Sequence, residues 1–222
     1  MFTFSLSGLE IKSNDNGPTE VEENETTSRS AVYMVFGKFF SPVNNEQYDA
    51  AINDHLDKEI KDAATLLPYS FDIGRPTVDS SLTLEKYMDE YSRLFSDSGG
   101  SKLLASSQTD DKENLVNQIK RDYEYFGLGA NADARPLDHL ATLCDFLQYL
   151  CFKEAATSSA RLKSSFERAQ RDFLEHYLTG WIPSLVDEVD KLTPTEPFSW
   201  ALNSLKYFIL ADYEYIVQIL GG

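Results

Sequence analysis

Hydrophobic residues recur every three or four positions along most of the chain after residue 28. This spacing places them on one face of a helix, so each such stretch predicts an amphipathic helix. Only "FTFSL" near the start alternates as a strand does, and it is too short and isolated to predict a sheet. The pattern predicts an all-α fold, a single-domain helical bundle with helices over about 28–40, 45–66, 81–95, 109–126, 135–152 and 160–180, a short helix near Pro183 and a last one over about 198–220.

Proline and glycine mark several of the predicted helix ends. Pro42 disfavours helical geometry in the residue before it, which stops the first helix. Gly127 follows the fourth helix and suits the left-handed position that commonly ends a helix. The last helix is apolar around most of its circumference, so we expect it to lie deep in the core.

Length and composition indicate one folded domain with a polar leader. The chain has 222 residues, of which 42% are hydrophobic and 13% aromatic, enough for a single core. Residues 12–28 are polar, acidic and without periodicity, so we expect a flexible leader over residues 1–27 and a helical domain over residues 28–222. Cys144 and Cys151 lie about 10 Å apart along one predicted helix, too far for a disulfide, which predicts reduced thiols in the core.

The net charge and the absence of a visible targeting signal indicate which class of partner and which cellular location to expect. No export signal and no membrane span is visible, so we expect a cytoplasmic protein without stable membrane insertion. The net charge is −16, from 20 basic and 36 acidic residues. Such a charge repels phosphate backbones and anionic lipid, which argues against nucleic acid and favours basic partners. Its alternative meaning is solubility alone.

An Asp-His pair lies at the start of the fifth predicted helix, in "RPLDHLATLCDFLQYLCF" at 135–152. Pro136 suits the first helical position, which places Asp138 in the first turn, where a carboxylate offsets the helix dipole. His139, beside the positive end of the helix, should resist protonation and serve as a neutral hydrogen-bonding group. The alternative for Asp138 is helix stabilisation alone.

The sequence offers little for catalysis or for metal binding. His55, His139 and His176 are the only histidines, none has H-E-x-x-H spacing, and both cysteines lie in an apolar seam. There is no G-x-S-x-G nucleophile motif, and "GLGANA" lacks the lysine of a phosphate-binding loop. We therefore predict no catalytic residue, no metal ligand and no cofactor.

Acidic and aromatic residues interleave in "DYEYFGLG" at 122–129. On a helix this order places the acidic and aromatic side chains, among them Asp122, Tyr125 and Phe126, on adjoining faces. Such a border suits an amphipathic peptide with a basic end and an apolar body. In the alternative interpretation Tyr123 and Phe126 are core residues and the acids are merely solvated.

Several stretches, in order along the chain, resemble the TorD/DmsD/NarJ family of molybdoenzyme chaperones. Pro136, Asp138, His139 and Leu140 match the family signature residue for residue, whereas the glutamate usual before the proline is Arg135 here. The pattern is most similar to the branch that serves dimethylsulfide and ethylbenzene dehydrogenases and selenate and chlorate reductases. The stretches that carry the resemblance are "AVYMVFGKFFSP", "EKYMDEYSRLF", "YEYFGLG", "RPLDHLATLCDFLQYL" and "RDFLEHYLTGWIP", which cover about residues 30–185.

The resemblance implies an all-helical, non-catalytic chaperone. Such a chaperone binds the N-terminal leader, often twin-arginine, of a molybdopterin-containing catalytic subunit and holds it until the cofactor is inserted, before export. We expect a monomer, with a dimer as the alternative. The residues expected to bind the peptide are Asp122, Tyr125, Phe126, Arg135, Pro136, Asp138 and His139.

Two other functions stay open at the level of the sequence. One is a metal-dependent hydrolase built on His and Asp ligands from several helices. The other is a general helical scaffold that binds a partner helix and has no connection with export.

Overall fold

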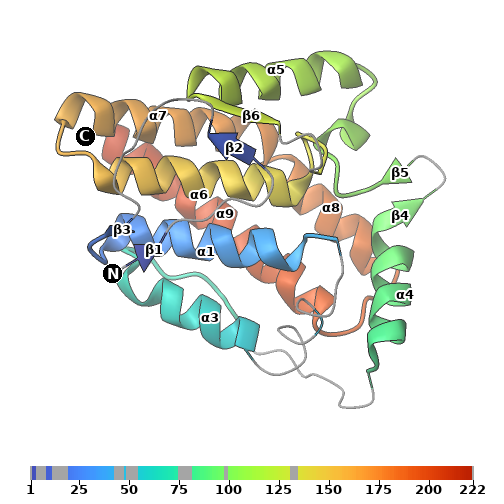
Figure 1. The fold of residues 1–222 in the computed structure, drawn as a ribbon. Coiled ribbons are helices and arrows are strands. Elements are labelled where there is room, and N and C mark those ends of the chain that lie inside the picture. The colour runs from blue at the N-terminus through green and yellow to red at the C-terminus, as the bar shows by residue number, and fades with distance from the viewer. Residues whose placement is uncertain are drawn as a thin grey trace.

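Helices dominate the structure, a computed structural model that describes residues 2–3, 9–11, 20–42, 48, 55–74, 82–97, 100–130 and 135–221 (Figure 1). The α-helices are α1 (Glu25–Phe39), α3 (His55–Ala63), α4 (Leu84–Phe95), α5 (Lys112–Tyr125), α6 (Leu140–Ala156), α7 (Ala160–Tyr177), α8 (Trp181–Asp190) and α9 (Phe198–Gly221). Two short 3-10 helices are η1 (Ala64–Leu66) and η2 (Ala105–Gln108). The all-α prediction is confirmed.

The described strands are very short and form two-stranded antiparallel pairs. β1 (Phe2–Thr3) pairs with β3 (Glu20–Val21), and β4 (Ser96–Asp97) pairs with β5 (Gly100–Ser101). β2 (Leu9–Ile11) pairs with β6 (Leu128–Ala130), the segment that follows α5. The described strands of the predicted leader are therefore paired, β1 and β3 with each other and β2 with a segment far along the sequence.

The first helix begins three residues earlier than its hydrophobic pattern predicts. The Asn24 side chain accepts hydrogen bonds from the backbone N–H groups of Thr26 and Thr27, at 2.9 and 3.0 Å. The Thr27 hydroxyl in turn accepts from the Asn24 N–H at 2.7 Å, which completes a capping box. The predicted leader over residues 1–27 therefore includes the first turn of α1. Because the cap lies in a polar run without periodicity, the hydrophobic pattern does not indicate it.

Two other predicted boundaries meet the structure differently. The fourth predicted helix begins at Lys112 instead of Thr109, because residues 109–111 adopt extended or irregular backbone ahead of α5. Its end is confirmed, since Gly127 has a φ of 75°. Of the helix predicted over 45–66, the structure describes α3, η1 and Tyr48, and the rest lies outside the described residues.

The core is organised around α6. Helices α1 and α6 lie side by side, α7 lies on the other side of α6, and α9 runs behind them (Figure 1). Every residue from Leu140 to Phe152 is buried, which explains why the segment is apolar around most of its circumference. The outer helices α5 and α3 lie at opposite sides of this stack (Figure 1).

The last helix and the two cysteines also occupy the core. α9 is buried through most of its first half, as predicted, but Val217 and Ile219 near its end are 41% and 40% exposed. Cys144 and Cys151 are both buried free thiols, which confirms the prediction for them. Burial raises the pKa of both thiols.

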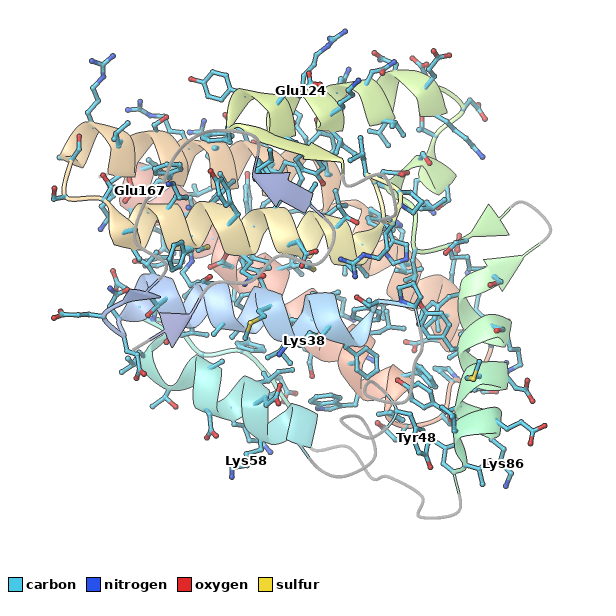
Figure 2. All side chains as sticks on the ribbon, in the orientation of Figure 1. Lys38, Tyr48, Lys58, Lys86, Glu124 and Glu167 are labelled. Atoms are coloured by element: carbon cyan, nitrogen blue, oxygen red, sulfur yellow. The ribbon has the colours of Figure 1, made fainter. Side chains whose placement is uncertain are left out.

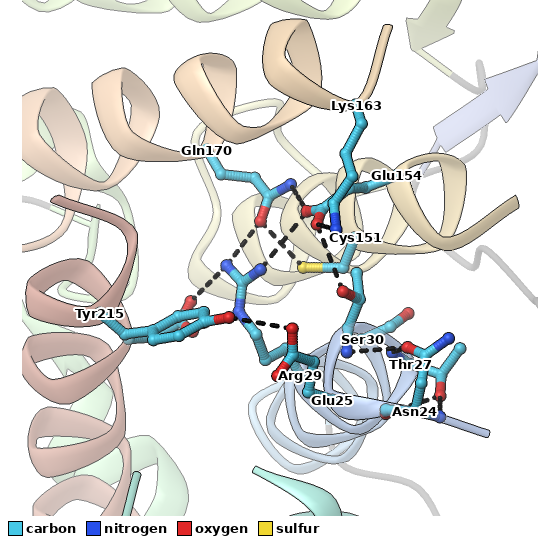
Figure 3. A network of polar contacts seen from close by, with 12 residues as sticks. Asn24, Glu25, Thr27, Arg29, Ser30, Cys151, Glu154, Lys163, Gln170 and Tyr215 are labelled. Carbon is cyan, nitrogen blue, oxygen red and sulfur yellow. Dashed lines mark hydrogen bonds and ion pairs between the residues drawn. The ribbon is translucent and has the colours of Figure 1, made fainter. Parts of the chain in front are cut away.

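One buried polar network crosses this apolar core (Figure 3). The guanidinium of Arg29, on α1, donates to the Asp212 carboxylate from Nε at 2.5 Å and from Nη2 at 3.1 Å. It also donates to Gln170 Oε1 at 2.5 Å and lies 3.5 Å from Glu154. Tyr33 donates to the same Asp212 carboxylate at 2.6 Å. The network therefore joins α1, α6, α7 and α9.

Within the described segments, none of the helices is both long enough and apolar enough to cross a lipid bilayer.

Candidate functional site

A groove of about 500 Å³ runs between α5 and α7, with Phe146 of α6 at its base. We call it the α5–α7 groove. Arg121, Asp122, Tyr125 and Phe126 line it from the side of α5. From α7 it is lined by Ser165, Arg168, Ala169, Asp172, Phe173, His176 and Tyr177.

Asp122 is the half-buried carboxylate of this groove. The hydroxyl of Tyr177, on α7, donates to Asp122 Oδ2 at 2.9 Å and so connects the two walls. Burial raises the pKa of Asp122, and the hydrogen bond from Tyr177 and the nearby His176 oppose that rise. A carboxylate in this position is partly stripped of water, which favours a cationic partner.

The aromatic residues of "DYEYFGLG" divide between the core and the groove. Tyr123 is buried and donates from its hydroxyl to the Leu137 carbonyl at 2.9 Å. Phe126 is partly buried, with ring centroids 5.9 Å from Phe146 and 5.7 Å from Phe166. Tyr125 is 78% exposed and lies against Phe126. The groove thus has an apolar base with one exposed ring above it.

Asp138 lies before α6 and not in its first turn, which corrects the prediction from the sequence. The helix begins at Leu140, because residues 136–139 form a turn in which the His139 N–H donates to the Pro136 carbonyl at 3.1 Å. The buried Asp138 carboxylate accepts from the Ser106 N–H at 3.0 Å, and its carbonyl accepts from the Ala105 N–H at 2.9 Å. Asp138 therefore holds η2 against the start of α6.

His139 is the N-cap residue of α6. Its Nδ1 accepts from the Ala141 N–H at 3.2 Å, so the ring offers a lone pair at this nitrogen. Burial, assisted by the charge of Arg135, lowers the pKa of His139 to about 4, and Asp138 opposes this shift. The hydrogen-bonding role predicted for His139 is confirmed, and its lowered pKa, caused mainly by burial, agrees with a neutral ring.

Arg135 and Pro136 lie apart from the α5–α7 groove. Arg135 Nη2 is 2.6 Å from Asp145 Oδ2, on α6, and Nη1 donates to the Ser41 hydroxyl after α1. The side chain of Arg135 is only 10% exposed, so this arginine serves as an internal connection. Pro136 is exposed and does not line the groove.

A second depression, of about 320 Å³, continues the groove toward η2. His176 and Tyr177 line both spaces, and Ala105 and Gln108 of η2 line the second one. Ala105 is the residue whose N–H the Asp138 carbonyl accepts. The structure therefore brings Asp122, Tyr125 and Phe126 together in the groove, whereas Asp138 and His139 lie behind one wall of its extension.

The α7 wall of the groove was not predicted from the sequence. Asp172, Phe173, His176 and Tyr177 lie within the helix predicted over 160–180, and none of them is among the residues expected to bind the peptide. The available signal was their spacing, because residues four apart on a helix share a face. His176 Nδ1 lies 2.6 Å from the Asp172 carbonyl oxygen.

No group of three or more His, Cys, Asp or Glu side chains suited to a metal ion occurs among the residues whose structure is described. The side chain of His55 lies outside that set. His139 is engaged as a helix cap, and His176 stands at the groove beside Asp172 without a further ligand-type cluster.

The sequence of the chain is similar to a known protein family and to several assembly chaperones. The family model described as "Nitrate reductase delta subunit" matches residues 49–187. The chain is 31% identical over 125 residues to the chlorate reductase assembly chaperone protein of Ideonella dechloratans, covering 53% of this chain and 65% of that one. It is 34% identical over 116 residues to the selenate reductase assembly chaperone protein of Thauera selenatis, covering 49% and 60%.

A further relative is the chaperone protein TorD of Shewanella amazonensis, 33% identical over 108 residues, which are 48% of this chain and 40% of the relative. The chain thus matches less than two thirds of the length of each of these relatives.

Proposed function

Because the chain belongs to the nitrate reductase delta subunit family, we propose that it is an assembly chaperone for a molybdopterin-containing catalytic subunit. It binds the N-terminal leader of that subunit in the α5–α7 groove, in the cytoplasm and as a monomer, until the cofactor has been inserted. The relatives named as assembly chaperones of chlorate and selenate reductases support this role. The chain itself carries out no catalysis in this proposal.

The observation that carries the proposal is the half-buried Asp122 above an aromatic base. A leader with paired arginines offers a planar guanidinium that forms strong hydrogen bonds with a carboxylate. Its apolar segment packs on Phe126 and on Tyr125, each buried aliphatic side chain contributing about 1.5–3 kcal/mol before ordering costs. Arg121 and Arg168 also line the groove, and Asp172 is already paired with Arg171, so the attraction for an arginine is local to Asp122.

The charge of the whole protein acts at longer range. A net charge of −16 attracts a basic leader during encounter, which raises the association rate and makes it sensitive to salt. The contacts inside the groove then determine how long the leader stays bound.

Asp138 and His139 act as positioning residues in this proposal. Asp138 holds η2 through the Ser106 and Ala105 N–H groups, and His139 caps the helix that supplies the base of the groove. Their match to the family signature is then explained by the wall that they support. Arg135 has the same kind of role, because it joins the segment before α6 to Asp145 and to Ser41.

Calorimetric titration with a synthetic twin-arginine leader tests the proposal. We expect Asp122→Asn and Tyr125→Ala each to weaken binding by at least about tenfold, because one removes the charge and the other the exposed ring. Glu124→Gln is the matched control for charge, since Glu124 lies on the outer face of α5 and forms an exposed ion pair with Lys120 (Figure 2). Tyr207→Ala, 42% exposed on α9, is the control for the ring.

A second peptide separates this function from a general scaffold. Replacing both leader arginines with glutamine should reduce the affinity at least as much as Asp122→Asn does. Equal affinity for the two peptides would show that the groove accepts a partner helix without regard to its arginines, and the leader-specific function would be wrong.

A further inference from the structure

We propose that a second groove, between α1 and the α3–η1 segment, binds a basic amphipathic helix of a partner protein. This α1–α3 groove has a volume of about 720 Å³. It lies on the side of the molecule away from α5, with α1, α6 and α7 between the two grooves (Figure 1). Occupation of one groove therefore leaves the other accessible, and this proposal stands independently of the leader site.

The base of the groove is a face of α1 whose middle part, Ala31, Met34 and Val35, is apolar. Thr27, Ala31, Met34, Val35 and Lys38 line the groove at helical spacing, so they follow one side of α1 for about 16 Å, or three turns. The small side chain of Ala31 leaves room where a larger residue would fill the space. This length and shape suit a helix of about three turns laid along α1.

The opposite wall, formed by α3 and η1, adds apolar surface that is partly exposed to solvent. Ala63 and Leu66 line the groove from the end of α3 and from η1. Leu66 is 45% exposed, which is high for a leucine beside a cavity. A partner helix would remove this side chain from water, and the gain favours docking of an apolar face.

The charged residues at the edge of the groove are segregated by sign. Glu59 and Asp62, both exposed and three positions apart on α3, line the groove. Glu23 lines it too, but its carboxylate already interacts with another group and adds little to this edge. The lysines of α3, Lys58 and Lys61, do not line it, and Figure 2 shows Lys58 on the outer side of the helix. Lys38 is the one cation among the lining residues.

This charge distribution selects the occupant. The two exposed carboxylates of α3, Glu59 and Asp62, repel an anionic helix, a phosphate backbone and anionic lipid. A helix with lysine or arginine flanking an apolar stripe places its cations on the acidic edge and its apolar side chains on the base. The floor is also rigid, because Arg29 fixes α1 to α9 from the other side of the helix.

Fluorescence anisotropy with the 222-residue protein tests this inference. The probe is a labelled model helix of about 18 residues composed of lysine, leucine and alanine, long enough to span the groove. Glu59→Lys with Asp62→Lys should weaken binding by at least about tenfold. The matched control, Asp187→Lys with Glu188→Lys, makes the same change of net charge at exposed positions of α8 and should alter the affinity less than about twofold.

A charge-neutral variant tests the base of the groove. Ala31→Trp should fill it and weaken binding of the probe, whereas Ala160→Trp, at an exposed position of α7, should not. Thermal unfolding of each variant verifies folding. Equal weakening by both charge reversals, or unchanged binding by Ala31→Trp in a folded protein, would overturn the proposal. The affinity for a twin-arginine leader serves as an internal reference, because it should change no more in the α1–α3 variants than in their matched controls.

Discussion

The Arg29 network and the α5–α7 groove contain the same kinds of side chain and differ in how completely these are paired. In the network the carboxylate of Asp212, 0% exposed, accepts from Arg29, Tyr33 and Tyr69. In the groove the half-buried carboxylate of Asp122 accepts from Tyr177 and still faces the cavity. Polar groups that satisfy one another stabilise a fold, whereas a partly desolvated group beside an open space is suited to binding.

Two arginines, Arg29 in the network and Arg168 at the groove, differ in the same way. Arg29 is 1% exposed and forms two ion pairs, with Asp212 and Glu154. Burial raises the pKa of Glu154, and the neighbouring Arg29 opposes that rise. Arg168, at the edge of the groove, is exposed. Removal of Arg29 leaves buried charges without a partner. Removal of Arg168 leaves groups that water solvates.

The largest effect is expected for the network. Arg29→Leu should lower the free energy of unfolding by about 3–5 kcal/mol, because Asp212 and Glu154 lose their buried cation. Urea denaturation followed by circular dichroism measures this change. Arg168→Leu is the control and should change the stability by less than about 0.5 kcal/mol.

Tyr69→Phe extends the same test if Arg29→Leu does not fold. It removes one hydrogen bond to Asp212 and should cost about 1–2 kcal/mol. The comparison fails if the Arg29 and Arg168 variants unfold at the same urea concentration.

The second effect is a pH dependence that arises from His139. The pKa of about 4 lies below the usual 6.5, so between these values the unfolded chain binds a proton that the folded protein does not. Stability should therefore fall as the pH drops from about 6.5 to 4, by about 3 kcal/mol for this residue.

His139→Asn isolates this contribution, because asparagine is a good N-cap residue and has no charge to gain. The difference in unfolding free energy between wild type and variant, measured at pH 7 and at pH 4, should shrink or reverse toward low pH. Parallel curves for the two proteins would contradict the low pKa of His139. Other groups titrate equally in both proteins and drop out of the difference.

The third effect distinguishes support of the groove from contact with the peptide. Asp138→Ala should lower the unfolding free energy by about 1–3 kcal/mol, because the Ser106 N–H loses its acceptor, and should weaken leader binding through the displaced η2. Asp138→Asn keeps an acceptor oxygen and should restore most of both losses. If the asparagine variant binds as poorly as the alanine variant while remaining stable, Asp138 contacts the leader by its charge.

The smallest effect on stability is expected in the groove itself. Tyr177→Phe removes one hydrogen bond from the half-buried Asp122 and should cost about 0.5–1.5 kcal/mol. The pKa of Asp122 should rise further, because the hydrogen bond that lowers it is lost. Carboxyl chemical shifts followed by NMR titration measure this rise. An unchanged pKa would mean that the Tyr177 hydroxyl does not interact with the charged form.

The hydrophobic pattern was sufficient for the fold class and for most of the helices. The mainly apolar run at 140–152 corresponds to a helix surrounded on all sides. The family prediction is confirmed by the match over residues 49–187. Helix starts were predicted less well. Asn24 caps a helix from within the predicted leader, and His139 caps one from within a segment predicted to be helical already. Where each helix begins depends on backbone hydrogen-bond partners that only the folded chain supplies.

The candidate site was only partly predictable. Asp122, Tyr125 and Phe126 share one face of one helix, so local spacing brought them together, and they do line the groove. The opposite wall on α7 depends on how two distant helices pack, which spacing does not encode. Arg29 was overlooked for the same reason. In a run rich in serine and threonine it has the local context of a surface residue, and its partners come from α6, α7 and α9.

The pairing of Leu9–Ile11 with Leu128–Ala130 has a practical consequence for work at the bench. Deletion of residues 1–11 would leave the strand Leu128–Ala130 without its partner. This unpaired strand edge, directly after the helix that carries Tyr125, would promote aggregation and disturb the α5–α7 groove. Affinity tags therefore belong at the carboxyl end, and an affinity measured on a shortened version should be measured again on the 222-residue chain.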